Sequence, residues 1–203
     1  VMYYLGENDS TKKEDGNAAV LDGTDGQVMV EVPEHYRKTS LNAAQGYMDT
    51  EISLYPFDGA VRIPRYLVSA YEATLDRDNN VLSSVKNTTA RYRGGDNTAD
   101  WDGTYRSLLG LPATNINLTN FRTYAQNRGS KWSCYDWTIN NDLFWLFAIE
   151  YATLDSQKAF NPDLDEAGMH QGGLGSGVSK LNNTSWGDYN SYNPIIPCGF
   201  TNS

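Results

Sequence analysis

The side chains that could carry out chemistry in this chain are few and widely spaced. Histidine occurs only at His35 and His170, and cysteine only at Cys134 and Cys198. A nucleophilic site needs a nucleophile, a base and a group that orients the base, and neither histidine lies in a sequence typical of such a site. These spacings also do not match a zinc site. We therefore expect no catalytic side-chain set, no metal and no cofactor, so that the protein is not an enzyme.

The histidines and cysteines have simpler interpretations. His35 follows a predicted strand and is interpreted as a surface or packing residue, whereas His170 lies beside glycines in a loop and could contact a ligand. A disulfide between Cys134 and Cys198 is possible, but two cysteines in 203 residues are not the density of a secreted disulfide scaffold. Two buried thiols are the simpler interpretation.

Paired carboxylates are the remaining catalytic possibility, because a glycosidase needs only two. With 25 acidic residues in the chain, close pairs arise by chance. The candidates are Glu72 with Asp76, Glu150 with Asp155, and the cluster Asp163, Asp165 and Glu166. Glu150 stands out because it interrupts an otherwise apolar run. We interpret it as half of a buried structural ion pair with an arginine: Arg91, Arg93 or Arg106.

Two short motifs resemble known ligand loops but fail in detail. Residues 76–80 begin like a calcium loop, yet Val81 stands where that loop needs glycine and Asn87 where it needs glutamate. The glycines of residues 172–177 lack the preceding strand and the following Lys-Ser or Lys-Thr pair of a nucleotide loop. A hairpin turn and a flexible loop are the better interpretations.

Composition excludes several classes of partner. Sixteen basic against 25 acidic residues give a net charge of −9, so binding to nucleic acid or to an anionic membrane through charge is not expected. No stretch approaches the roughly 20 apolar residues of a membrane span. With 39% hydrophobic residues, the chain can still bury a core.

Local patterns predict the strands that position these residues. Apolar runs and period-2 alternation predict strands at residues 2–5, 27–32, 51–55 and 65–75. The last strand turns at residues 76–80 and returns through 81–85 as a hairpin with a loop of four or five residues. Asp-Gly dipeptides at residues 15–16, 22–23 and 25–26 predict turns with positive φ. Residues 1–60 form the predicted N-terminal β segment.

Two helices are predicted in the second part of the chain. Asn117 is a good N-cap for a helix over about 118–128, and Gly129 fits its C′ position. A second helix is predicted over about 138–157. Because its apolar residues cover nearly all sides, we expect it to be the buried central helix of the core.

Residues 182–193 are the most suggestive for binding. They combine aromatic rings with small hydrogen-bonding side chains, as adaptable recognition surfaces do, and sugars also stack on such rings. A structural loop whose rings fold back onto the core is the alternative. The candidate ligand-binding residues are Trp186, Tyr189, Asn190, Tyr192 and Asn193, together with His170.

Five segments carry a resemblance to a known family: YLVSAYEA (66–73), YRSLLG (105–110), LTNFRTYA (118–125), WLFAIEYA (145–152) and GGLGSG (172–177). Through them the chain resembles proteins from phages and prophages of Bacteroides-type gut bacteria. That family is similar to tail-fibre or receptor-binding components and to the variable proteins of diversity-generating retroelements. The resemblance implies a C-type-lectin-like α+β fold over residues 61–203, with two helices packed on a small twisted antiparallel sheet and long irregular loops.

The chain departs from this family in two ways. Its residues do not match the lectin-type calcium site, so calcium-dependent sugar binding is not carried over. In the family, the chain continues past a segment like residues 197–203 into strands that carry the variable binding residues. We therefore expect this sequence to be incomplete at its C-terminus.

The function that we expect is a non-enzymatic recognition domain of a phage tail fibre or virion appendage, located in the virion. Its expected partners are a bacterial surface glycan or protein receptor and other virion subunits, and a homo-oligomer is expected. The alternative is a structural decoration or fibre-attachment protein that makes subunit contacts. A remote third possibility is a sulfatase-modifying-like oxidase, which would need Cys134 and Cys198 within bonding distance in a cleft.

Overall fold

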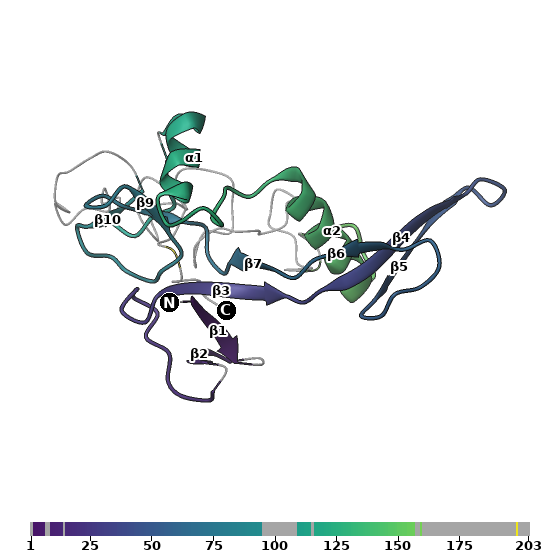
Figure 1. Ribbon diagram of the computed structural model, residues 1–203, viewed down its shortest axis with the longest axis horizontal. Helices are drawn as coiled ribbons and strands as arrows, with labels where there is room; N and C mark the ends of the chain where they lie inside the picture. The colour runs from purple at the N-terminus through teal and green to yellow at the C-terminus, as the bar shows by residue number, and fades with distance from the viewer. Residues whose placement is uncertain are drawn as a thin grey trace, which may run out of the picture. The chain divides into compact units, whose positions relative to one another are not determined.

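The computed structural model describes residues 2–6, 9–13, 15–94, 109–114, 116–156, 159 and 198. It confirms the α+β class, with two helices and several small, mainly antiparallel sheets (Figure 1). The chain forms two compact units. Unit 1 comprises Val1–Met29, Ser69–Cys134 and Asp155–Ser203, and unit 2 comprises Val30–Val68 and Tyr135–Leu154. The boundary predicted between residues 60 and 61 falls inside unit 2.

One four-stranded sheet contains the N-terminal strands. Its order is β2-β1-β3-β7, made of β1 (Met2–Gly6), β2 (Asp9–Lys13), β3 (Gln27–Val32) and β7 (Tyr66–Ser69). β1 runs antiparallel to β2 and parallel to β3. The strands predicted at residues 2–5 and 27–32 are confirmed, and the glycines of all three Asp-Gly dipeptides have positive φ.

The strand predicted at residues 65–75 is instead two strands. β7 ends at Ser69, and β8 (Thr74–Asp76) begins a second sheet of order β10-β8-β9, with β9 (Val81–Ser83) and β10 (Tyr92–Arg93). Between β7 and β8, the backbone N–H of Ala70 donates to Val28 O and that of Ala113 donates to Ala73 O. Because these hydrogen bonds engage the residues between β7 and β8 with other segments, the two strands do not join into one continuous strand. The predicted hairpin is confirmed, because β8 pairs antiparallel with β9 across residues 77–80.

Backbone pairing within unit 1 forms a closed neck between residues 93–94 and 109–114. Arg93 pairs with Leu109 in an isolated bridge, and the N–H of Thr114 donates to Gly94 O at 2.7 Å. A Cβ added at Gly94 would lie 2.4 Å from Pro112 O, so no larger residue fits there. Residues 94 and 109–114 therefore hold together the two ends of segment 95–108.

Helix α1 (Leu118–Gln126) packs on the β8–β9 hairpin in unit 1. Asn117 is its N-cap, as predicted, with its side chain accepting from the N–H of Asn120. The predicted C′ role of Gly129 is wrong, because the helix is capped at Asn127 and Gly129 lies one residue beyond C′. The intervening Arg128 donates to Leu82 O and to Ser83 Oγ and so ties the helix end to β9.

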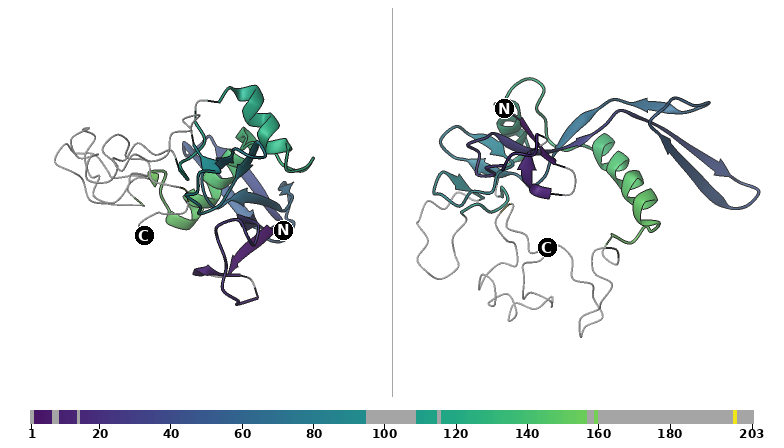
Figure 2. Two further views of the ribbon diagram at one scale, coloured as in Figure 1. Left: turned by 90° about the vertical axis from the view of Figure 1, so that its left-hand side faces the viewer. Right: turned by 90° about the horizontal axis from the view of Figure 1, so that it is seen from below.

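The sheet of unit 2 has the order β5-β4-β6, with β4 (His35–Asn42), β5 (Tyr47–Ser53) and β6 (Val61–Ile63). β6 pairs only with residues 35–37 of β4, so the β4–β5 hairpin continues beyond Arg37 as a two-stranded arm (Figure 2). The strand predicted at 51–55 matches only the end of β5. It stops at Ser53, whose Oγ accepts from the N–H of Tyr55 and turns the chain.

Helix α2 (Trp137–Tyr151) has Asp136 as its N-cap. It ends before the predicted residue 157, because Ala152 takes a left-handed conformation (φ 50°). The prediction of a buried central helix is wrong. Only Asp142 is buried among its residues, since the thin sheet of unit 2 covers one side of the helix. Glu150 is exposed, so its interpretation as a buried ion pair is also wrong.

Candidate contact surface

Asp142 fastens α2 to the sheet of unit 2. Its side chain is only 3% exposed and accepts three hydrogen bonds. His35 Nε2 and Arg37 Nη1, both from β4, donate to Oδ1 at 3.1 and 2.9 Å. Tyr66 Oη, from β7, donates to Oδ2 at 2.7 Å. A buried carboxylate is tolerated because cations and hydrogen-bond donors surround it, and here they fix the helix in one rotational setting.

This buried cluster is closed to catalysis. Nδ1 of His35 is hydrogen-bonded to Pro33 O at 2.9 Å, so both ring nitrogens are engaged and neither is free to act on a substrate. Burial and the hydrogen bond to the Asp142 carboxylate raise the pKa of Tyr66. Tyr66 therefore remains a neutral donor. His35 is a packing residue, and the surface alternative is wrong because its side chain is buried.

The exposed side of α2 carries an aromatic stripe, which we define as Trp137, Asn140, Phe144, Phe147 and Tyr151. Trp137, Phe144 and Tyr151 recur every seven residues and are 76%, 40% and 59% exposed. Asn140 and Phe147 fall three residues after the first two. At 3.6 residues per turn, the stripe runs along the side of α2 opposite Asp142. The buried anchor therefore turns these rings outward.

The rings of this helix support one another. Phe147 stacks on Tyr151 with ring centroids 4.8 Å apart, and Phe144 and Trp145 form a T-shaped pair with ring centroids 5.2 Å apart. Such contacts restrict ring motion and lower the entropy that a partner must remove on binding. The helix contains no lysine or arginine, and its acidic residues are the buried Asp142 and the exposed Glu150. The stripe is thus an uncharged, pre-ordered aromatic surface.

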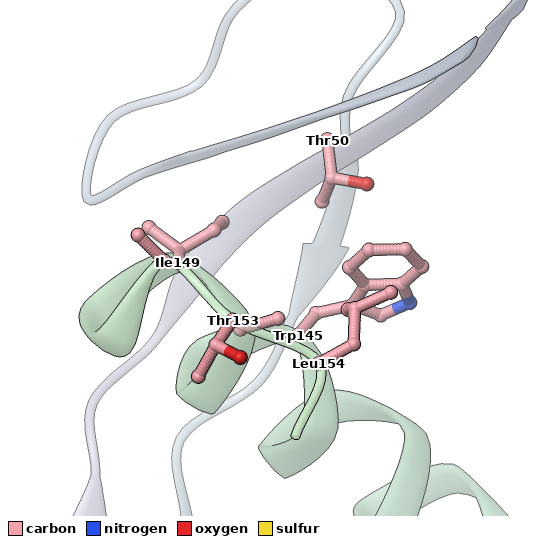
Figure 3. Close-up of a pocket in the computed structure, with 7 residues that line it drawn as sticks. Thr50, Trp145, Ile149, Thr153 and Leu154 are labelled. Atoms are coloured by element: carbon pink, nitrogen blue, oxygen red, sulfur yellow. The ribbon is translucent and has the colours of Figure 1, made fainter. Parts of the chain in front are cut away.

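A pocket of about 340 Å³ lies between β5 and the C-terminal half of α2 (Figure 3). Thr50 of the hairpin forms one side and Trp145, Ile149 and Leu154 the other. Its remaining lining residues are Ala148, Ala152 and Thr153, so no ionisable side chain lines it. Farther along the arm, Leu41 and Met48 face each other across the two strands and are 73% and 53% exposed. The outer part of the arm therefore also exposes apolar side chains.

The turn that resembles a calcium loop is occupied by an arginine. Arg91 donates from Nε and Nη2 to Asp76 at 2.8 and 2.7 Å, and the N–H groups of Asp78 and Asn79 also bind this carboxylate. Burial alone would raise the pKa of Asp76, but the hydrogen bonds from Arg91 and Asn79 outweigh it and lower the pKa. The interpretation as a hairpin turn is confirmed, and the Asp76 carboxylate is held by Arg91 and by backbone N–H groups of that turn.

Both cysteines are free thiols, so the possible disulfide is not formed. Burial raises the pKa of Cys198 to about 12 and also raises that of the partly buried Cys134. Reactive cysteines have lowered pKa values instead. Cys198 thus matches the interpretation as a buried thiol, whereas Cys134 is only partly buried.

The ligand-binding residues predicted from the sequence lie outside the described residues: His170, Trp186, Tyr189, Asn190, Tyr192 and Asn193. The features that the structure does bring together, Asp142 with its donors and the aromatic stripe, were not identified from the sequence. Two signals could have found them. Asp142 is a charged residue inside an apolar run, and the rings at 137, 144 and 151 have heptad spacing.

In the part of the chain that the structure describes, no helix is both long and apolar enough to cross a bilayer. No protein-family model matches the chain, and neither the curated proteins nor the solved structures contain a match to it.

Proposed function

We propose that this chain is a structural subunit of a multi-subunit particle and that unit 2 makes contacts with neighbouring subunits. The observation that carries the proposal is the aromatic stripe, which holds Trp137, Phe144 and Tyr151 at 76%, 40% and 59% exposure on one helix. The largest contiguous apolar patch on a soluble protein is often functional, because removing such a surface from water is favourable. A surface of this kind is a protein contact.

The composition of the surface supports the same function. Tyr, Trp and Phe are enriched at the centres of protein interfaces, whereas Lys, Glu and Asp are depleted there. The stripe follows this pattern, with four rings and no charge. The Asp142 cluster adds the rigidity that an interface requires, because three donors from two strands hold α2 in place.

The resemblance to tail-fibre components of phages and prophages makes a virion the particle that we propose. A decoration protein or a fibre-attachment protein would account for the exposed aromatic stripe, since either kind of protein must bury part of its surface against neighbouring subunits. Two helices with small antiparallel sheets are compatible with the C-type-lectin-like fold, which remains part of the proposal.

Recognition of a bacterial surface glycan or protein receptor is the second candidate function. The observation that favours it is the sequence of residues 182–193, in which rings alternate with amide and hydroxyl side chains. The two functions are compatible, because a subunit held in a particle by unit 2 can bind a receptor through another segment. Replacing Trp186, Tyr189 and Tyr192 together with alanine should then abolish adsorption and leave incorporation unchanged. Unchanged adsorption would rule out this site.

The test of the contact function is incorporation into particles. Phe144→Ser and Tyr151→Ser would be combined in cells that carry the gene, and the released particles purified and probed for the chain by quantitative mass spectrometry. Loss of one central ring costs about 2 kcal/mol at an interface, so we expect at least a roughly 10-fold lower content. Leu54→Ser is the matched control, since Leu54 is an exposed leucine of unit 2 outside the helix. Wild-type content of the double variant would refute the proposal.

A further inference from the structure

We infer that the aromatic stripe of α2 pairs with the same stripe of a second copy of this chain, with the two helices antiparallel. The inference rests on the proposed function and names the partner at that contact.

The spacing indicates that the partner is a helix. Residues 137, 144 and 151 occupy one heptad position, and residues 140 and 147 occupy a second position three residues later. This is the pattern of a and d positions along a seam between two helices. The stripe spans 14 residue steps, or roughly 21 Å at 1.5 Å per residue. A narrow seam of this length fits one helix and is poorly matched to a flat sheet.

The charge of α2 excludes a lipid surface and favours a like partner. Helices that lie on membranes carry lysine and arginine on their polar face, whereas α2 carries neither. Helix pairs between different proteins are usually selected by complementary charges beside the seam. The heptad positions beside this stripe hold Asn141 and Ala148 on one side and Leu143 and Glu150 on the other, so Glu150 is the one charged residue of α2 that flanks the seam. The five residues of the stripe are themselves uncharged, so two copies of the stripe can pack together without charge repulsion between them.

The order of residues favours the antiparallel arrangement. In that arrangement an a position of one helix (137, 144 or 151) faces a d position of the other (140 or 147). At the centre of the pair, Phe144 of each copy therefore lies against Phe147 of the other copy. The outer layers place Asn140 against Tyr151 of the second copy. Oδ1 of Asn140 accepts from Tyr135 Oη at 3.2 Å, so the amide N–H groups of Asn140 can donate to that tyrosine hydroxyl. A parallel pair would instead align both helix dipoles.

The area indicates a weak contact that needs many copies. Taking about 200 Å² for a fully exposed ring, the exposures of Trp137, Phe144 and Tyr151 offer roughly 350 Å² per copy. Roughly 700 Å² for the pair is below the 1,200 Å² of a stable interface, so we expect dissociation constants of tens of micromolar or weaker. Within a particle, simultaneous contacts among many subunits raise the effective affinity.

Disulfide trapping tests the arrangement directly. Full chains carrying Phe144→Cys and Phe147→Cys would be purified separately, mixed in equal amounts and oxidised, with the wild-type chain giving the background from Cys134 and Cys198. The antiparallel pair predicts a covalent dimer that forms at least several-fold faster in the mixture than in either variant alone. The control mixture is Thr138→Cys with Ile149→Cys, two exposed positions on the side of the helix opposite the seam. Faster trapping of Phe144→Cys with itself would overturn the antiparallel order.

Sedimentation equilibrium at concentrations up to about 0.5 mM gives the second measurement, since a contact of this size requires such concentrations. We expect the wild-type chain and Leu54→Ser to associate reversibly and Phe144→Ser to remain monomeric. Circular dichroism confirms that each variant is folded. Two results together would refute the second copy as partner and leave the proposed contact function intact. The wild-type chain would be monomeric in sedimentation, and the Phe144→Ser, Tyr151→Ser variant would still be lost from particles. Wild-type incorporation of that variant would refute the contact function itself.

Discussion

Replacing Asp142 with alanine should destabilise unit 2 more than any other single change on α2. The substitution leaves His35 and Arg37 facing an apolar space without the carboxylate that accepts from both. Breaking a buried ion pair costs about 3–5 kcal/mol, and the lower end applies because Arg37 is 17% exposed and can reach water. At roughly 2–4 °C per kcal/mol for a chain of this size, the thermal midpoint should fall by roughly 6–12 °C.

The assay is urea unfolding followed by tryptophan fluorescence, because Trp137 and Trp145 both lie on α2. Glu150→Ala is the control, since this exposed carboxylate on the same helix should change the free energy of unfolding by less than about 0.5 kcal/mol. Asp142→Asn keeps one acceptor oxygen and should lose less than the alanine variant. If Asp142→Ala unfolds within about 1 kcal/mol of the wild type with an unchanged denaturant slope, the cluster does not anchor the helix.

The remaining predictions concern unit 1. Cys198 should resist alkylation by iodoacetamide at neutral pH. Because its folded pKa is raised to about 12, its contribution to stability should be lost as the pH rises above 9.0, and Cys198→Ala should reduce this alkaline loss. Asp76 has a lowered folded pKa, so the free energy of unfolding should fall as the pH drops below 3.8, and this acid loss should be smaller in Asp76→Asn. Asn117→Ala removes the N-cap of α1 and should cost about 1 kcal/mol in urea unfolding, whereas equal stability would contradict the capping role.

Local signals in the sequence were sufficient for much of the fold. Period-2 alternation located β3 at residues 27–32, and the turn at 76–80 located the β8–β9 hairpin, because both depend on neighbouring residues alone. The N-cap Asn117 was identified for the same reason. The break between β7 and β8 could not be foreseen, since it depends on hydrogen bonds from Ala70 to Val28 and from Ala113 to Ala73.

The burial of α2 was misjudged because hydrophobicity alone does not say what covers a helix. An apolar run is typical of a core helix, but it is equally typical of a helix whose cover is another subunit. The candidate site was missed for a related reason. Asp142 acquires its role from His35 and Tyr66, which are 107 and 76 residues away in the chain, and no local pattern connects them.

The closed neck at Gly94 has a consequence for how the chain tolerates change. Its two sides are joined by the Arg93–Leu109 bridge and the Thr114–Gly94 bond, so the ends of segment 95–108 meet whatever length of chain lies between them. Lengthening a closed loop adds only about 0.6 kcal/mol of closure entropy per doubling. An insertion between residues 94 and 109 should therefore cost little closure entropy at the neck, because the described residues on its two sides stay joined by the bridge and the hydrogen bond.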